Sequence, residues 1–294
     1  MVDQGIPFLN PKYSILEMKN TFGLDGGVQL GCRRNGDGVP YLSSQHFSPP
    51  VHLSKPYFDE VTHSLLINLS CPTAGLLAGD RMLCDIEVTD QASMVVTTPG
   101  ATRSHFMRSG VARVEQNLKV RDGSFLEFNP GSLILQKATN LEQVTKVEVD
   151  EDAEILFVEK MLPGRIAHGE SFVFQKFSNR LSIKRGNQLA LLESFVLDAE
   201  NESVLPWKNS FSTPFYGSFY LISSKLREHL PCREKIHGMI SPNLLTGATS
   251  LHRKAGWMVK VLAGDPYEFK QAMREIRKLL HSDIGRAPTD FRRF

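Results

Sequence analysis

One eleven-residue pattern recurs along the chain: IEVTDQASMVV at residues 86–96, LKVRDGSFLEF at 118–128, VEVDEDAEILF at 147–157 and, more weakly, LSIKRGNQLAL at 181–191. Apolar residues occupy the first, third, ninth and eleventh places of every copy, and a polar or glycine-bearing link lies between them. Alternation with a period of two is typical of a strand with one buried face. Each copy is therefore predicted to form a strand, a turn and a second strand.

The copies follow one another at similar distances, because their first residues are 32, 29 and 34 positions apart. A single unit of this kind cannot bury its apolar face alone, whereas stacked neighbours can, as in solenoid proteins. Ordinary meandering hairpins with coincidental spacing are the alternative. We expect stacked β layers.

Helical signals lie late in the chain. Residues 265–281 read DPYEFKQAMREIRKLLH, in which Asp265 suits the N-cap, Pro266 the first helical position and Glu268 the residue that reaches back to the cap. The apolar residues of this segment share one helical face: Phe269, Met273, Ile276 and Leu280. A second, shorter helix is expected around residues 223–230. The predicted fold is mostly β, with β-solenoid-like strand–turn–strand layers and two helices in the C-terminal third.

Composition narrows the class of protein. The 294 residues include 34 basic and 32 acidic side chains, without the dense basic patch of a nucleic-acid-binding protein. No apolar stretch approaches the ~20 residues that cross a bilayer, and no signal peptide is visible. The four cysteines include no CxxC pair. We expect a cytoplasmic protein that binds neither nucleic acid nor membrane. Because no linker divides residues 1–294, a single domain is predicted, with an extended C-terminal tail from about residue 283.

Short catalytic signatures are missing, including the phosphate-binding loop, HExxH and GxSxG. Three other segments combine glycine with charged residues: CPTAGLLAGDR at 71–81, TTPGATR at 97–103 and EKMLPGRIAHGE at 159–170. Taken alone, the first is a turn that orients Asp80, and the second presents Arg103 as a possible anion-binding group. In the third, Arg165 is available to pair with a carboxylate at the rim of a sheet.

These segments, in this order, resemble the UreD (also called UreH) family of urease accessory proteins. The resemblance rests on an ordered set of motifs that extends from about Phe47 to the end of the chain: PxxGxxxGD at 72–80, TPGATR at 98–103, Leu-Glu at 126–127, GRxxxGE at 164–170, VKVLAGD at 259–265, Gly-Arg at 285–286 and Arg292.

The resemblance implies a noncatalytic maturation factor with a mostly β fold. Such a protein binds apo-urease on one side and the accessory protein UreF on the other, with the GTPase UreG beyond UreF. Nickel is expected to pass through an internal, water-filled passage in this assembly. No tightly bound cofactor is implied, only transient nickel.

Matching positions assign candidate residues for this role. Four carboxylates are candidates for the ion route: Asp80, Glu127, Glu159 and Glu170. Three further residues are expected to shape it: Thr102, Arg103 and Arg165. In the tail, Phe291 and Phe294 are candidate anchors for a partner. Sparse oxygen donors would hold Ni²⁺ weakly and release it, whereas a tight site would trap the ion.

Two other classes of function are alternatives for this sequence. A β-solenoid hydrolase acting on polysaccharide would use Glu127 and Glu159 as acid and base. Such an enzyme needs a groove lined by aromatic residues, yet the chain has only two tryptophans, Trp207 and Trp257. A purely structural β module would leave the Gly-Asp and Gly-Arg segments without a purpose. The maturation factor is therefore the favoured hypothesis.

Overall fold

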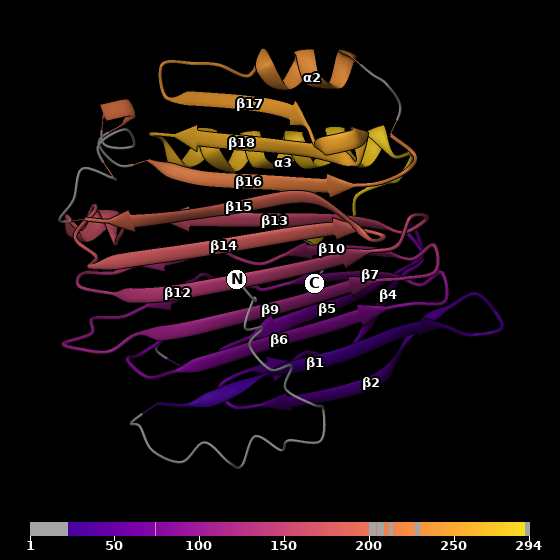
Figure 1. Cartoon of the computed structure of the whole chain (residues 1–294), viewed down its shortest axis with the longest axis horizontal. Coiled ribbons are helices and arrows are strands. Elements are labelled where there is room, and N and C mark those ends of the chain that lie inside the picture. The colour runs from indigo at the N-terminus through magenta and orange to yellow at the C-terminus, as the bar shows by residue number, and fades with distance from the viewer. Residues whose placement is uncertain are drawn as a thin grey trace, which may run out of the picture.

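Two facing β-sheets form the body of the protein (Figure 1). The computed structural model describes residues 23–73, 75–199, 204, 209–211, 214–226 and 230–291. The first sheet has seven strands in the order β15 (Gln188–Asp198), β14 (Lys176–Arg185), β12 (Asn140–Val149), β9 (Ala112–Val120), β6 (Arg81–Val88), β1 (Asp25–Arg34) and β2 (Pro40–Ser48).

The second sheet has eleven strands. Its main path runs through β17 (Leu244–Ser250), β18 (Gly256–Ala263), β16 (Phe215–Ile222), β13 (Glu154–Leu162), β10 (Phe125–Asn129), β7 (Ser93–Thr97), β5 (Ser64–Ser70) and β3 (His52–Leu53). Three short strands lie off this path: β4 (Tyr57–Asp59), β8 (Thr102–Ser104) and β11 (Leu133–Leu135).

The first three copies of the repeat each cross from one sheet to the other, and equivalent residues stack. In the seven-stranded sheet, Ile86 pairs with Leu118 and Leu118 with Val147, all in parallel strands. In the other sheet, Leu126 pairs with both Met94 and Ile155. These side chains meet in one apolar cluster between the sheets. The prediction of stacked, solenoid-like strand–turn–strand layers is confirmed.

The fourth copy behaves differently. Its two strands, β14 and β15, form an antiparallel hairpin within the seven-stranded sheet, and Val147 pairs with Ile183 rather than with Leu181. Only two residues, Gly186-Asn187, separate the strands of this copy, and Gly186 has a φ of 53°, whereas four residues separate the two strands in each of the first three copies. A two-residue loop with positive φ reverses a chain tightly, so the strand returns beside its predecessor instead of turning a corner.

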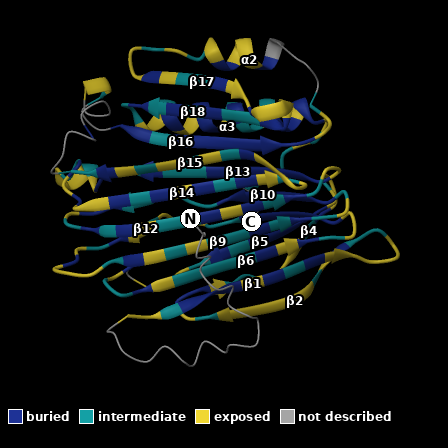
Figure 2. Ribbon diagram, in the orientation of Figure 1, coloured by how far each residue is buried: buried dark blue, intermediate teal, exposed yellow. Residues whose placement is uncertain are grey.

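Burial follows the strand pattern (Figure 2). The central strands β7, β10 and β13 are largely buried, whereas the edge strand β2 is mostly exposed. Apolar residues of the two sheets meet in two separate clusters, one around Ile86 and Phe157 and the other around Leu141 and Phe177. The space between these two clusters is where polar side chains are found.

Helix α3 (Pro266–Asp283) covers the outer face of the eleven-stranded sheet. Asp265 caps it by accepting a hydrogen bond of 2.8 Å from the backbone N–H of Glu268, as the sequence predicts. Its apolar face packs in a third cluster with residues of β16 and β18, such as Phe219 and Val259. In the described part of the chain, no helix combines the length and the apolar character needed to span a membrane.

The second helix begins later than expected. Residues 223–226 are not helical, and α2 runs over Leu230–His237. The Ser223 hydroxyl donates a short hydrogen bond to the buried Glu154 and accepts one of 3.0 Å from the backbone N–H of Lys225. This side-chain turn competes with helix formation, which explains the shifted start.

Candidate functional site

The inward face of the seven-stranded sheet changes from apolar to polar midway along its strands. Gln116 on β9 is the register partner of Thr145 on β12, and Gln143 on β12 is the partner of Asn179 on β14. The Thr145 hydroxyl donates a hydrogen bond of 2.9 Å to the Gln116 side chain. We call these four side chains the polar band. It lies between the two apolar clusters that join the sheets.

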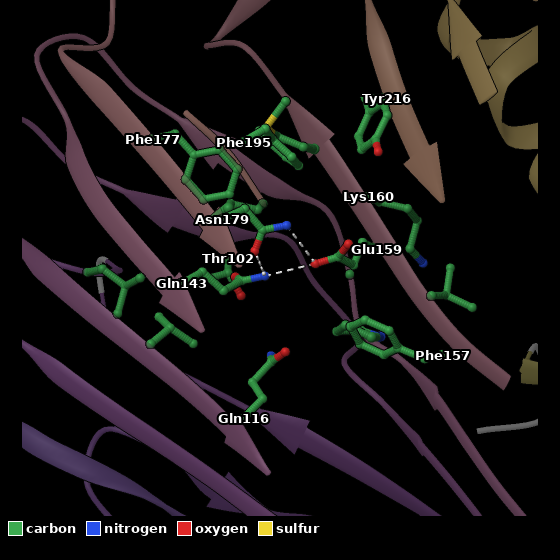
Figure 3. A pocket seen from close by; sticks show the side chains of 17 residues that line it. Thr102, Gln116, Gln143, Phe157, Glu159, Lys160, Phe177, Asn179, Phe195 and Tyr216 are labelled. Atoms are coloured by element: carbon green, nitrogen blue, oxygen red, sulfur yellow. Dashed lines mark hydrogen bonds between the residues drawn. The ribbon is translucent and has the colours of Figure 1, made fainter. Parts of the chain in front are cut away.

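Glu159 of β13 faces the polar band from the opposite sheet (Figure 3). Its Oε1 accepts hydrogen bonds from the Gln143 amide at 3.0 Å and from the Asn179 amide at 3.2 Å. Its Oε2 accepts one of 3.3 Å from the hydroxyl of Tyr220 on β16. One carboxylate thus joins three polar side chains in the space between the sheets.

A cavity of about 100 Å³ lies at this position. Its lining includes Thr102, Gln116, Gln143, Glu159 and Tyr216, with apolar walls from both neighbouring clusters (Figure 3). A single water needs only ~10–15 Å³ of such volume together with polar partners, so the cavity has room for several. It is a small chamber in which a few polar groups interrupt a mainly apolar lining.

The groups that surround Glu159 shift the pKa of its carboxyl group. Burial raises the pKa of Glu159, and the nearby Glu193 adds to this, whereas Lys260 and the hydrogen bonds from Asn179 and Tyr220 act against it. The net pKa is above the ordinary value for a glutamate. The Glu159 carboxylate is therefore protonated more readily than one in bulk water.

Asp80 does not reach the cavity. It is buried, and its two carboxylate oxygens accept hydrogen bonds of 2.8 Å from the backbone N–H groups of Leu24 and Leu77. It thereby ties the start of β1 to the turn before β6, which agrees with the turn-orienting role that the segment suggests when taken alone.

Replacing Asp80 with alanine is expected to lower the free energy of unfolding by about 1–3 kcal/mol, because two backbone N–H groups lose their acceptor. Urea denaturation measures the change. The control is Asp37→Ala in an exposed turn, which should stay within ~0.5 kcal/mol of the unmodified chain. Equal effects at the two positions would show that the Asp80 contacts add no stability.

Glu127 points to the other side of its sheet. It pairs in register with Leu156, so it shares the outward face of the eleven-stranded sheet, whereas Glu159 shares the inward face. Its carboxylate is fully buried and forms a bidentate ion pair with Arg277 of α3, at 2.6 and 2.7 Å. His281 Nε2 lies 3.0 Å from the same carboxylate.

This placement bears on the hydrolase alternative. An acid and a base that cleave a glycosidic bond must flank the same bond. Glu127 and Glu159 lie on opposite faces of one sheet, and Glu127 is engaged by Arg277. The two carboxylates therefore cannot act on one sugar.

Glu170 pairs with Arg165 within one loop. The Arg165 Nε donates a hydrogen bond of 2.9 Å to Glu170 Oε2, and a second guanidinium N–H donates to Oε1. This hydrogen bonding lowers the pKa of Glu170. The pair joins the two ends of the loop after β13, where Gly164 has a φ of 156° and an added Cβ would come within 2.5 Å of the Glu170 carbonyl oxygen. Of the four candidate carboxylates, only Glu159 lines the cavity.

Thr102 and Arg103 are neighbours on β8 but differ in their surroundings. Thr102 lines the cavity, whereas the Arg103 side chain is exposed. The backbone of Arg103 packs against Gly75, where an added Cβ would come within 2.2 Å of the Arg103 carbonyl oxygen. That contact explains why a glycine stands at position 75.

The described part of the tail, up to Phe291, packs against the rest of the protein. The Phe291 ring lies under the guanidinium of Arg277, 4.1 Å from the ring centre. Arg286 contacts the buried Glu154 carboxylate at 3.0 Å. Phe291 is thus already in contact with α3, and Phe294 lies outside the described residues.

The family profile described as "UreD urease accessory protein" matches residues 24–294, which is most of the chain. The chain belongs to the UreD family. Among its relatives is the urease accessory protein UreD of Opitutus terrae, which is 32% identical over 91% of this chain and 98% of its own length. The UreD of Yersinia enterocolitica is 29% identical over 78% of this chain and 73% of its own length. That of Photorhabdus laumondii is 25% identical over 89% of this chain and 83% of its own length.

Sequence reasoning missed the polar band of this UreD family member. The signal was present, because three of its residues lie two positions before the first residue of a repeat copy: Gln116, Thr145 and Asn179. The alternation continues upstream of each copy, so these polar residues occupy inward positions. Among the described residues, no three His, Cys, Asp or Glu side chains gather as a metal-binding group.

Proposed function

We propose that this UreD family member is a noncatalytic urease maturation factor. In this role it is a scaffold that binds apo-urease and accessory proteins of the UreF and UreG type, and it helps to deliver nickel to the urease active site. Membership of the family supports a role in urease maturation. The finer assignment to nickel delivery rests on the polar cavity between the sheets.

The observation that carries the proposal is a carboxylate facing amide and hydroxyl groups in a cavity large enough for water. Glu159 and Thr102 place oxygen atoms at this point, and the Gln143 and Asn179 amides hold the Glu159 carboxylate through their N–H groups. Oxygen donors suit hard and borderline divalent cations, but thiolate and imidazole groups bind nickel more firmly. A cargo ion must be released again, so a single carboxylate with low affinity for the ion is better suited than a closed set of ligands.

The apolar clusters on both sides of the polar band favour a confined path. A hydrated cation avoids apolar surroundings because it would lose its water there. The ion would therefore be restricted to the polar chamber between the sheets. Nickel is cargo in this scheme, and the protein keeps no resident metal.

Replacing Glu159 with glutamine removes the one carboxylate among the described residues that line the cavity, but keeps the size of the side chain. We expect nickel-dependent activation of urease to fall roughly tenfold at limiting nickel, which corresponds to ~1.4 kcal/mol of lost stabilisation of the passing cation. The assay is urease activity in cells that lack their own UreD gene and express this chain with a urease operon.

The matched control is Glu115→Gln. Glu115 is exposed and lies one residue from Gln116 on the outward face of β9. Both variants should still co-purify with the UreF-type partner, because neither substitution changes the fold. If E159Q activates urease as well as E115Q does, with both variants present at equal levels, the proposed role of the cavity is wrong.

A further inference from the structure

The ammonium group of Lys260 lies in a shell of oxygen atoms beside the cavity. Lys260 is on β18, and its Nζ contacts Glu193 Oε1 at 2.6 Å, the Tyr216 hydroxyl at 2.7 Å, the Tyr220 hydroxyl at 2.8 Å and the Ser218 hydroxyl at 3.1 Å. The ammonium also lies over the rings of both tyrosines, at 5.3 and 4.9 Å from their centres. We call these four groups the oxygen shell.

The oxygen shell is directly connected to the cavity. Tyr216 belongs to both, since its side chain also lines the cavity (Figure 3). The Tyr220 hydroxyl lies 3.3 Å from Glu159 and 3.2 Å from Glu193, so it connects the carboxylate of the cavity with that of the shell. The Lys260 side chain is 30% exposed and that of Glu193 is 20% exposed, so solvent also reaches the shell.

The chemistry of the shell is that of a cation site. One carboxylate, two phenols and one hydroxyl surround a single positive charge, and a second carboxylate stands behind Tyr220. Oxygen donors of this kind are the ligands of hard divalent cations. Here the cation is part of the chain. Its partners hold the pKa of Lys260 above the ordinary value, against the effect of burial, so the ammonium stays protonated.

We propose that Lys260 is a tethered cation, which fills the oxygen shell and so prevents a divalent cation from being held beside the cavity. The proposal rests on the proposed function, because there the passing cation is nickel and must not be trapped. The single proton of the Tyr220 hydroxyl can be donated to only one of the two carboxylates at a time. Without the Lys260 charge, Glu159 and Glu193 would face each other with no compensating cation, and a divalent ion would supply that charge.

The test uses the full chain alone, without urease, and nickel chloride as the probe. Lys260→Met keeps the length of the side chain and removes its charge. We expect K260M to bind one Ni²⁺ at least tenfold more tightly than the unmodified chain in isothermal titration calorimetry. The double variant K260M/E193Q should lose this gain, because the carboxylate of the shell is neutralised. K260R keeps the charge and should resemble the unmodified chain.

If K260M is too unstable for calorimetry, the melting temperatures of K260M and K260R with and without nickel chloride test the same proposal. A ligand that binds only the folded state raises its stability, so nickel should stabilise K260M far more than K260R. If nickel neither binds K260M more tightly nor raises its melting temperature more than that of K260R, the proposal is overturned. These nickel-binding measurements involve no urease, so a negative result with K260M would leave the proposed function standing. Conversely, if E159Q activates urease as well as its control E115Q does, the nickel-binding result for K260M is unchanged.

Discussion

Replacing Glu127 with glutamine is expected to lower the free energy of unfolding by about 3–5 kcal/mol, the cost of breaking a buried ion pair by removing one partner. The carboxylate has no exposed surface, and the paired Arg277 side chain is only 13% exposed. The Asn129 amide also donates a hydrogen bond of 2.9 Å to it. Glutamine would leave the Arg277 guanidinium buried without a counter-charge, which loosens α3 from the sheet.

The contacts of Glu127 also predict how the stability that it contributes depends on pH. Burial alone would raise the pKa of Glu127, but the charges of Arg277 and His281 and their hydrogen bonds lower it well below its ordinary value of 4.5. A carboxyl group with a lowered pKa in the folded state contributes stability above its unfolded pKa, and this contribution is lost as the pH falls below that value. The difference between E127Q and the unmodified chain should therefore be largest at neutral pH and shrink below about pH 4.5.

Urea denaturation at pH 7 and pH 4 measures both effects. The control is Glu142→Gln, which breaks the exposed ion pair between Arg113 and Glu142 and should cost less than ~1 kcal/mol. A cost for E127Q as small as that for E142Q, or one that does not change with pH, would contradict the role assigned to the Arg277 pair.

The second large effect is expected from filling the cavity. Gln143→Trp places an indole where the amide now contacts Glu159 and Asn179. The cavity holds only about 100 Å³, so the indole would displace the water that a cation needs. We expect urease activation to fall more than tenfold. The fold should survive, since overpacking costs about 1–3 kcal/mol.

A tryptophan on the outward face of the same strand is the matched control. Lys146 is exposed on β12, three residues from Gln143 and on the opposite face, so Lys146→Trp adds the same bulk outside the cavity. K146W should activate urease normally. Equal activation by the two variants would mean that the space around Gln143 is not on the path of nickel.

Much of the fold could be predicted from the sequence because its determinants are local. The alternation in the copies at 86–96, 118–128 and 147–157 depends only on neighbouring residues, and these copies stack in register. The cap at Asp265 is local too. The hairpin of the fourth copy was not predicted, because its apolar spacing matches the others and only the Gly186-Asn187 link distinguishes it.

The site was less predictable because its contacts join distant parts of the chain. Glu127 and Glu159 look equivalent as acidic residues near apolar strands, yet period-two alternation places them on opposite faces of the sheet. Arg277, the partner of Glu127, lies 150 residues further along the chain. Lys260 and Glu193 are 67 residues apart and come from different sheets. Their pairing depends on how the sheets face each other, which no local pattern contains.

The nickel content of urease tests the role of the cavity most directly. Apo-urease would be incubated with UreF- and UreG-type proteins, GTP, nickel and this chain, then separated and its bound nickel measured by elemental analysis over time. With the unmodified chain and with K146W, nickel should accumulate in urease at the same rate, and with Q143W it should remain near the level seen without this chain. Equal accumulation with Q143W in an intact complex would contradict passage of the ion between the sheets.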